Sequence, residues 1–134
     1  MSRATTELPT VARAFLALPL PATLTTLRPD GTVHVTPVRF TFDAAAGLAR
    51  VTTRARTRKA RNVATGGPLA RGALCQADGL RWITLEGRAE VSDDRTRVAE
   101  AVRRYTDRYR MVPPAPPDLV VIEITVERVL GLNL

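Results

Sequence analysis

Six short segments rich in β-branched and apolar residues follow one another along the chain, and their spacing limits the fold more than any other feature. Turn chemistry separates them, with Pro29-Asp30-Gly31 after the first segment and Asp78-Gly79 after the fourth. These residues favour strands joined by hairpins. The predicted strands are Ala22–Arg28, Thr32–Phe42, Leu48–Thr53, Leu69–Gln76, Arg81–Val91 and Leu119–Val126. An antiparallel barrel, closed or nearly closed, is expected because closure removes exposed edges.

Three short helices are predicted between and beside the strands. Apolar residues recur at helical spacing from Leu8 to Leu16, which indicates an amphipathic helix that covers one end of the sheet. A helix over Thr57–Thr65 would stop at Gly66-Gly67-Pro68, and Ser92-Asp93-Asp94 would cap a helix that ends near Tyr109. The expected fold is therefore mainly β with short helices, six antiparallel strands and a single domain over residues 1–134.

A proline interrupts the second predicted strand. Pro37 has no N–H to donate, so the strand lies at an edge, contains a bulge, or meets something other than a neighbouring strand. His34 and Thr36 share one face of this strand because successive side chains alternate across the sheet. His34 is either a barrel histidine with its hydrogen bonds satisfied or a residue that lines a pocket.

The composition excludes several classes of function. The chain has one cysteine, Cys75, and one histidine, His34, so no zinc spacing and no disulfide framework exist. No apolar run approaches the roughly 20 residues that span a bilayer, and no secretion signal opens the sequence. We expect a cytoplasmic protein with no membrane partner. The net charge of +7 attracts anions, but only six aromatic residues and no nucleic-acid-binding motif are present, which favours a small polyanionic ligand over nucleic acid.

The densest basic stretch contains the only lysine of the chain. Lys59 stands among nineteen arginines, and the stretch from Arg50 to Arg61 holds no acidic residue. The predicted strand that ends at Thr53 leads here into the helix that opens near Thr57. First-turn amides of a helix point outward and attract a phosphate, and hydroxyl, guanidinium and ammonium groups on that turn add to the attraction.

These residues carry a resemblance to a known family. Thr53, then Thr57-Arg58-Lys59-Ala60, then Arg81–Arg88 with its Glu86-Gly87 pair, resembles the flavin-binding split barrels of the pyridoxamine-phosphate-oxidase type. The similarity covers about Leu20 to Gly131. Within that superfamily the chain is most similar to the F420-dependent biliverdin reductases of actinobacteria, through the following stretches: Thr25–Arg28, Phe40–Asp43, Asp78–Trp82 and Leu85–Ala89.

The resemblance implies a homodimeric split β-barrel with the cofactor at the subunit interface. Coenzyme F420 is the expected cofactor, with FMN as the alternative. The implied cofactor-binding residues are, for the phosphate, Thr53, Thr57, Arg58 and Lys59; for the deazaflavin ring, the backbone of Thr36, Pro37 and Val38; and for the acidic tail, Arg54, Arg56 and Arg61. Trp82 would come from the partner subunit. Arg54 and Arg56 are equally well read as solvated loop charges, and Trp82 as packing.

The activity implied by the same resemblance is hydride transfer from reduced F420 to an electron-poor acceptor. Biliverdin, reduced to bilirubin, is the preferred acceptor, and quinones or similar molecules are others. No catalytic acid stands out in the sequence, so no catalytic residue is assigned. An FMN-dependent oxidoreductase of the same fold and a non-catalytic F420-binding protein are the alternatives.

Overall fold

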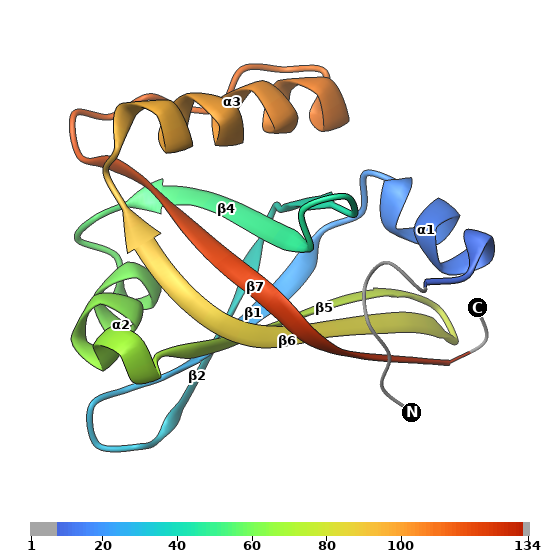
Figure 1. The fold of residues 1–134 in the computed structure, drawn as a ribbon, viewed down its shortest axis with the longest axis horizontal. Coiled ribbons are helices and arrows are strands. Elements are labelled where there is room, and N and C mark those ends of the chain that lie inside the picture. Colours follow the sequence, from blue (N-terminus) through green and yellow to red (C-terminus); the bar gives the residue numbers. More distant parts are fainter. Residues whose placement is uncertain (1–7, 133–134) are drawn as a thin grey trace.

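The computed structural model describes residues 8–132, and its elements alternate short helices with antiparallel strands (Figure 1). In chain order they are α1 (Thr10–Ala17), β1 (Ala22–Leu27), β2 (Val33–Val38), β3 (Thr41–Asp43), β4 (Leu48–Arg54), α2 (Arg58–Gly66), η2 (Gly67–Leu69), β5 (Arg71–Asp78), β6 (Arg81–Ser92), α3 (Arg95–Tyr109) and β7 (Leu119–Leu132). The predicted fold class, mainly β with short helices, is confirmed. Among the described residues, no helix combines the length and the apolar character needed to cross a membrane.

The structure has seven strands where the sequence predicted six, because the stretch from Thr32 to Phe42 is divided into β2 and β3. The division falls at Arg39 and Phe40. The hydroxyl of Tyr109 accepts a hydrogen bond from the Phe40 N–H (3.0 Å) and donates one to the Phe40 carbonyl (2.9 Å). A side chain of α3 therefore satisfies the backbone groups that a neighbouring strand would otherwise pair, and the ladder breaks there.

The sheet is one antiparallel array in the order β2-β1-β5-β6-β7-β4-β3. The array has two free edges, β2 and β3, so full closure of the barrel, one of the two expected outcomes, does not occur. The long strands β6 and β7 bend across the middle of the molecule and carry the two halves of the sheet around the core (Figure 1). Pro37 lies on the edge strand β2, where its missing N–H breaks no inter-strand bond.

The core fills the concave side of this sheet. Leu24, Leu74, Ile83, Leu85 and Ile124 are almost fully buried there. Helix α1 closes one end of the core with Phe15 and Leu16, as its amphipathic pattern predicted. The amide of Gln76 donates to the Phe15 carbonyl (2.7 Å), which fixes the helix to β5.

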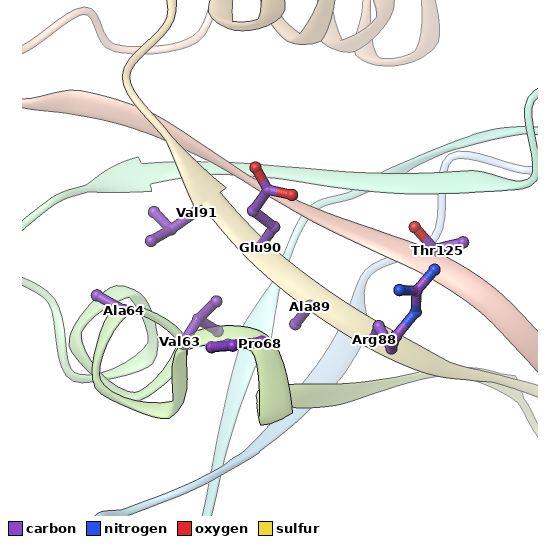
Figure 2. A pocket seen from close by; sticks show the side chains of 9 residues that line it. Val63, Ala64, Pro68, Arg88, Ala89, Glu90, Val91 and Thr125 are labelled. Atoms are coloured by element: carbon purple, nitrogen blue, oxygen red, sulfur yellow. The ribbon is translucent and has the colours of Figure 1, made fainter.

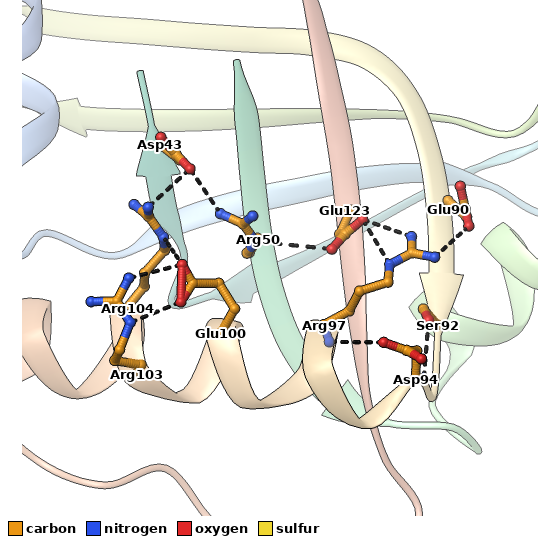
Figure 3. Close-up of polar contacts among 10 residues, drawn as sticks. All are labelled: Asp43, Arg50, Glu90, Ser92, Asp94, Arg97, Glu100, Arg103, Arg104 and Glu123. Carbon is orange, nitrogen blue, oxygen red and sulfur yellow. Dashed lines mark hydrogen bonds and ion pairs between the residues drawn. The ribbon is translucent and has the colours of Figure 1, made fainter. Parts of the chain in front are cut away.

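An ionic network holds α3 against the opposite side of the sheet (Figure 3). Glu123 of β7 accepts from Arg97 of α3 (2.6 Å), and Asp43 of β3 accepts from Arg104 (3.0 Å). Arg50 of β4 lies between the two carboxylates, 3.4 Å from Asp43 and 3.9 Å from Glu123. The helix is thus positioned by alternating charges at three neighbouring strands.

Within residues 8–132 no helix covers the convex side of β2, β1, β5 and β6. Leu27 is 52% exposed and alternates with buried residues along β1, whereas Val33 and Val35 are 56% and 55% exposed and alternate with half-buried residues along β2. The strand register places further residues on the same side, and we call this set the outer face: Thr23, Thr25, Leu27, Val33, Val35, Pro37, Ala73, Cys75, Ala77, Trp82, Thr84 and Glu86. Most of these residues are apolar, and Glu86 is the charged one.

Candidate functional site

The site begins where β4 passes into α2, at two threonine hydroxyl groups. Thr57 caps the helix, since its Oγ1 accepts from the Ala60 N–H (3.4 Å) and donates to the Arg54 carbonyl (2.9 Å). The Oγ1 of Thr53, the last inward residue of β4, lies 3.1 Å from that of Thr57. The predicted hydroxyl pair is therefore brought together at the start of α2, beside the outward-pointing amides of the first turn.

Two cations occupy the first turn of α2, where the helix dipole already places positive charge. Arg58 and Lys59 are both partly buried, and that turn contains no acidic residue. Arg58 donates to the Asn62 Oδ1 (3.3 Å), one turn further along. Among residues 8–132 no carboxylate forms an ion pair with Arg58 or Lys59. Cations are locally unfavourable at a helix N-terminus, so this arrangement stabilises an external anion rather than the helix itself.

Burial lowers the pKa of the Lys59 ammonium below its ordinary value. The ammonium is partly buried without a carboxylate partner within residues 8–132, at a cost in stability. A bound phosphate would supply the missing negative charge. The fit between the residues present and a phosphate group is therefore good in both charge and hydrogen-bonding capacity.

Strands β1 and β2 form the facing wall of the site. The side-chain amide of Asn62 donates to the Oγ1 of the buried Thr26 (3.0 Å), which connects α2 to β1. His34 pairs with Thr26 across the two strands, so both side chains lie on the same side of the sheet. The expectation of a satisfied barrel histidine is wrong, because the Nδ1 of His34 is shielded from solvent and has no hydrogen-bond partner within the described chain.

The remaining arginines of the basic stretch differ in how much of their charge is available to a phosphate. Arg54 donates to the Oδ1 of Asp118 (2.9 Å), so part of its charge is neutralised within the chain. Desolvation alone would raise the pKa of Asp118, but the hydrogen bond and charge of Arg54 outweigh it and the pKa lies below its ordinary value. Arg56 and Arg61 are exposed and stand on either side of the first turn.

The residues expected at the cofactor ring lie next along β2. Thr36 shares the inner side of the strand with His34, whereas Pro37 faces outward and is exposed. Val38 is buried in the core, which leaves only its backbone available to a ligand. No strand pairs with the free edge of β2 within residues 8–132, so a planar group has access to this backbone.

Trp82 is separated from the start of α2 within one chain. It lies on the outer face, at the hairpin end of β6, opposite Ala77 of β5. Arg88, six residues further along the strand and near α2, is roughly 20 Å away at about 3.3 Å per residue. A single chain therefore does not bring Trp82 to the start of α2.

Hollows of about 410 and 240 Å³ adjoin the basic helix, and Arg28 and Asn62 line the smaller one. The larger, about 410 Å³, lies at the C-terminal end of α2 and against β6, away from the threonine pair (Figure 2). Its two charged residues are already paired, Arg88 with Glu127 (3.5 Å) and Glu90 with Arg97 (2.9 Å). A further hollow of about 330 Å³ lies beside Thr53, at the end of β4, and is bounded by Pro114 and Pro116. Chemistry favours the region around Thr53 as the ligand site, because the Thr53 and Thr57 hydroxyls lie close together there, and Arg58 and Lys59, which follow, have no carboxylate partner within residues 8–132.

Asn62 and Asp118 had no role in the sequence prediction, and His34 was expected either to be a satisfied barrel histidine or to line a pocket. Asn62 follows Arg58 by four positions, which is a detectable helical spacing, but its contact with Thr26 is a long-range one. Asp118 and His34 come from segments far from α2 in sequence, and only the fold brings them close. No group of three or more histidine, cysteine, aspartate or glutamate residues that suits a metal ion exists within residues 8–132.

Comparison with known proteins gives three similarities. The sequence profile of the pyridoxamine 5′-phosphate oxidase family matches residues 8–133. An F420H2-dependent biliverdin reductase of Mycobacterium tuberculosis (strain CDC 1551 / Oshkosh) is 48% identical over 131 residues, which cover 98% of this chain and 93% of that protein. The solved structure of an F420 reductase is 27% identical with a TM-score of 0.72, and the match covers 92% of this chain and 98% of that one.

A further solved structure supports the fold alone. A conserved hypothetical protein from Mycobacterium tuberculosis has a TM-score of 0.75 at 22% identity, and the match covers 98% of this chain and 88% of that chain. The split-barrel architecture predicted from the sequence is thereby confirmed, with an open edge at each end of the sheet.

Proposed function

The chain belongs to the pyridoxamine 5′-phosphate oxidase family, and from that membership we propose that it is an F420-dependent reductase that transfers a hydride to biliverdin. The proposal of cofactor and acceptor is supported by the 48% identity, over nearly the whole chain, to a protein named as an F420H2-dependent biliverdin reductase. Biliverdin accepts one hydride and one proton to give bilirubin, so the reaction balances without another reactant.

The single observation that carries the proposal is the uncompensated positive charge at the start of α2. Arg58 and the half-buried Lys59 directly follow Thr57, whose hydroxyl lies 3.1 Å from that of Thr53, and within residues 8–132 no carboxylate is paired with either cation. Each charge-assisted hydrogen bond contributes about 1.5–3 kcal/mol, so three or four of them suffice for a micromolar anchor after the costs of association. The phosphate of F420 fits this set of donors.

Reduced F420, when bound, supplies the hydride. The chain's contribution would be to hold the phosphate at Thr53, Thr57, Arg58 and Lys59. The backbone of Thr36, Pro37 and Val38, on the edge strand β2, would be available to the ring. The exposed Arg56 and Arg61 attract the acidic tail, whereas Arg54 is partly neutralised by Asp118 and contributes less.

The proposed assembly is a homodimer formed through the outer face. Monomers rarely leave a contiguous apolar sheet surface uncovered, and Leu27, Val33 and Val35 are each about half-exposed here. A two-fold interface over this face would place Trp82 of one subunit toward the β2 edge of the other. Trp82 then contributes to the partner's cofactor site, which explains why it lies far from α2 in its own chain. We also propose that the protein acts in the cytoplasm.

The test is anaerobic oxidation of reduced F420 by the purified protein, with biliverdin, a quinone and a nitro compound as acceptors in parallel. We expect rapid formation of oxidised F420 and bilirubin with biliverdin, and slower or no reaction with the others. A parallel titration of FMN and oxidised F420, followed by ligand fluorescence, compares the two cofactors directly. Tight FMN binding with no oxidation of reduced F420 would refute the proposal.

A further inference from the structure

His34 lies on the side of the β1–β2 hairpin that faces α2, and the sequence left open whether it is a structural histidine or lines a pocket. Its cross-strand neighbour is Thr26, whose hydroxyl accepts a hydrogen bond from Asn62. Asn62 in turn accepts from Arg58. These two hydrogen bonds connect β1 to α2. The pairing of His34 with Thr26 places the imidazole on the side of the sheet that faces α2.

The surroundings of this imidazole are positive and lack a partner for it. Burial first, and then the charges of Arg28, Lys59 and Arg58, lower the pKa of His34 below its ordinary value. The carboxylate of the same hairpin, Asp30, is occupied by the backbone N–H and hydroxyl of Thr32 (3.0 and 2.6 Å). The Nδ1 atom is shielded from solvent and unpartnered within residues 8–132. A polar atom that is shielded from solvent and lacks a hydrogen-bond partner lowers the stability of the fold unless a ligand supplies the partner.

We propose that His34 is a fourth basic residue of the phosphate site and that binding of the ligand phosphate is coupled to uptake of one proton by its imidazole. The inference rests on the proposed function and adds a residue and a proton to it. A phosphate would reverse both causes of the low pKa, because it offsets the three neighbouring cations and offers an oxygen that accepts from the imidazolium. The proton comes from solvent, and no covalent step is involved.

The coupling has a definite sign. The free protein has a pKa at His34 below about 6.5, and the complex has a higher one. Between these two values binding takes up a proton, so affinity increases as the pH falls through that window. Each unit of difference between the two pKa values corresponds to about a tenfold change in affinity.

The experiment uses the fact that His34 is the only histidine of the chain. An untagged protein has one imidazole Cε1–H signal in its proton NMR spectrum, and its pKa is read from a titration of the wild type. We would titrate the free protein, then the protein saturated with oxidised F420, with FMN or with inorganic phosphate. The expected result is a free pKa below about 6.5 that rises by about one unit or more with bound F420.

Two variants separate a direct role from a structural one. Lys59→Met should raise the pKa of His34 in the free protein, because one of the cations that lower it is removed. His34→Asn should remove the excess pH dependence of F420 affinity, measured as the ratio of wild-type to variant dissociation constants from pH 8 to pH 5.5. That ratio cancels any ionisation of F420 itself. A ratio that stays constant with pH would overturn the proposal.

The outcomes distinguish this inference from the function on which it rests. If F420 binds, by fluorescence, and the pKa of His34 does not move, His34 is not a phosphate residue, whereas the proposed function stands. If F420 does not bind but FMN or inorganic phosphate raises the pKa, the site is correct and the cofactor is not. If none of the three anions changes the pKa, the proton-coupled site is refuted.

Discussion

At the scale of single residues, Lys59 is held half-buried without an acidic partner, and this predicts opposite effects on stability and binding. Lys59→Met keeps the stem and removes the desolvated charge, so the free protein should melt about 1–3 °C higher. The same substitution should weaken F420 binding about tenfold or more. Thermal melting and fluorescence titration measure the two effects.

The pH dependence of the Lys59→Met effect follows from the lowered pKa. In the folded protein Lys59 releases its proton at a lower pH than in the unfolded chain, so the unfolded chain holds more protons in that window. The gain in stability from Lys59→Met should therefore be full at neutral pH and should disappear as the pH rises toward about 10.4. Arg13→Ala, an exposed cation on α1, is the control and should leave F420 affinity unchanged. Equal weakening by both variants would mean a general charge effect.

The sequence predicted part of the site at this scale and missed the rest for a physical reason. Thr53 and Thr57 are close in sequence, and a helix cap determines their geometry locally. The contacts of Asn62 with Thr26 and of Arg54 with Asp118 join segments 36 and 64 positions apart. Local spacing carries no information on such pairs, so the hydrogen-bonding state of His34 was not predictable either.

At the scale of elements, the β6–β7 pairing requires a glycine. The register shifts between Glu86 and Gly87, and a Cβ added at Gly87 would lie 1.7 Å from the Thr125 carbonyl oxygen. Backbone cannot yield as a side chain does, so we expect Gly87→Ala to destabilise the protein by about 3 kcal/mol or more. Chemical denaturation measures this change.

Gly72→Ala is a matched control for Gly87→Ala, because both glycines lie in paired strands. The added Cβ at Gly72 would meet the end of the flexible Ile124 side chain at 3.0 Å. We expect a loss below about 1.5 kcal/mol for this change. Similar losses for the two variants would show that the close approach of β6 and β7 is relaxed in solution.

Helix α3 gives a prediction about acid. Hydrogen bonds from Arg103 (2.8 Å) and Arg104 (3.0 Å) lower the pKa of Glu100 to about 2. As the pH falls, Glu100 is therefore protonated at a lower pH in the folded protein than in the unfolded chain. The stabilisation from its ion pairs is present above about pH 4.5 and is lost as the pH falls to about 2. Glu100→Gln should lower the melting temperature by about 1–3 °C at pH 7 and by nothing near pH 2. A difference that persists at low pH would contradict this account.

The boundaries of the helices and strands show which features a local sequence pattern is sufficient to predict. The caps of α2 and α3, Thr57 and Asp94, lie where the sequence predicted them, because a cap is a contact within four residues. The break between β2 and β3 was missed, since it depends on Tyr109, 69 positions from Phe40. The strand order was also beyond prediction, because it depends on which distant strands pair.

At the scale of the whole molecule, the outer face predicts that the cofactor site exists only in the dimer. Val35→Asp would place a carboxylate from each subunit in the proposed interface, and we expect the dimer dissociation constant to rise by about 100-fold or more. F420 affinity should fall with it, because in the proposed dimer Trp82 comes from the partner subunit. Val11→Asp, at a similarly exposed valine on α1, is the control and should leave the dimer intact. Sedimentation velocity and F420 titration measure both variants, and a monomeric Val35→Asp with unchanged F420 affinity would show that one chain is sufficient for the site.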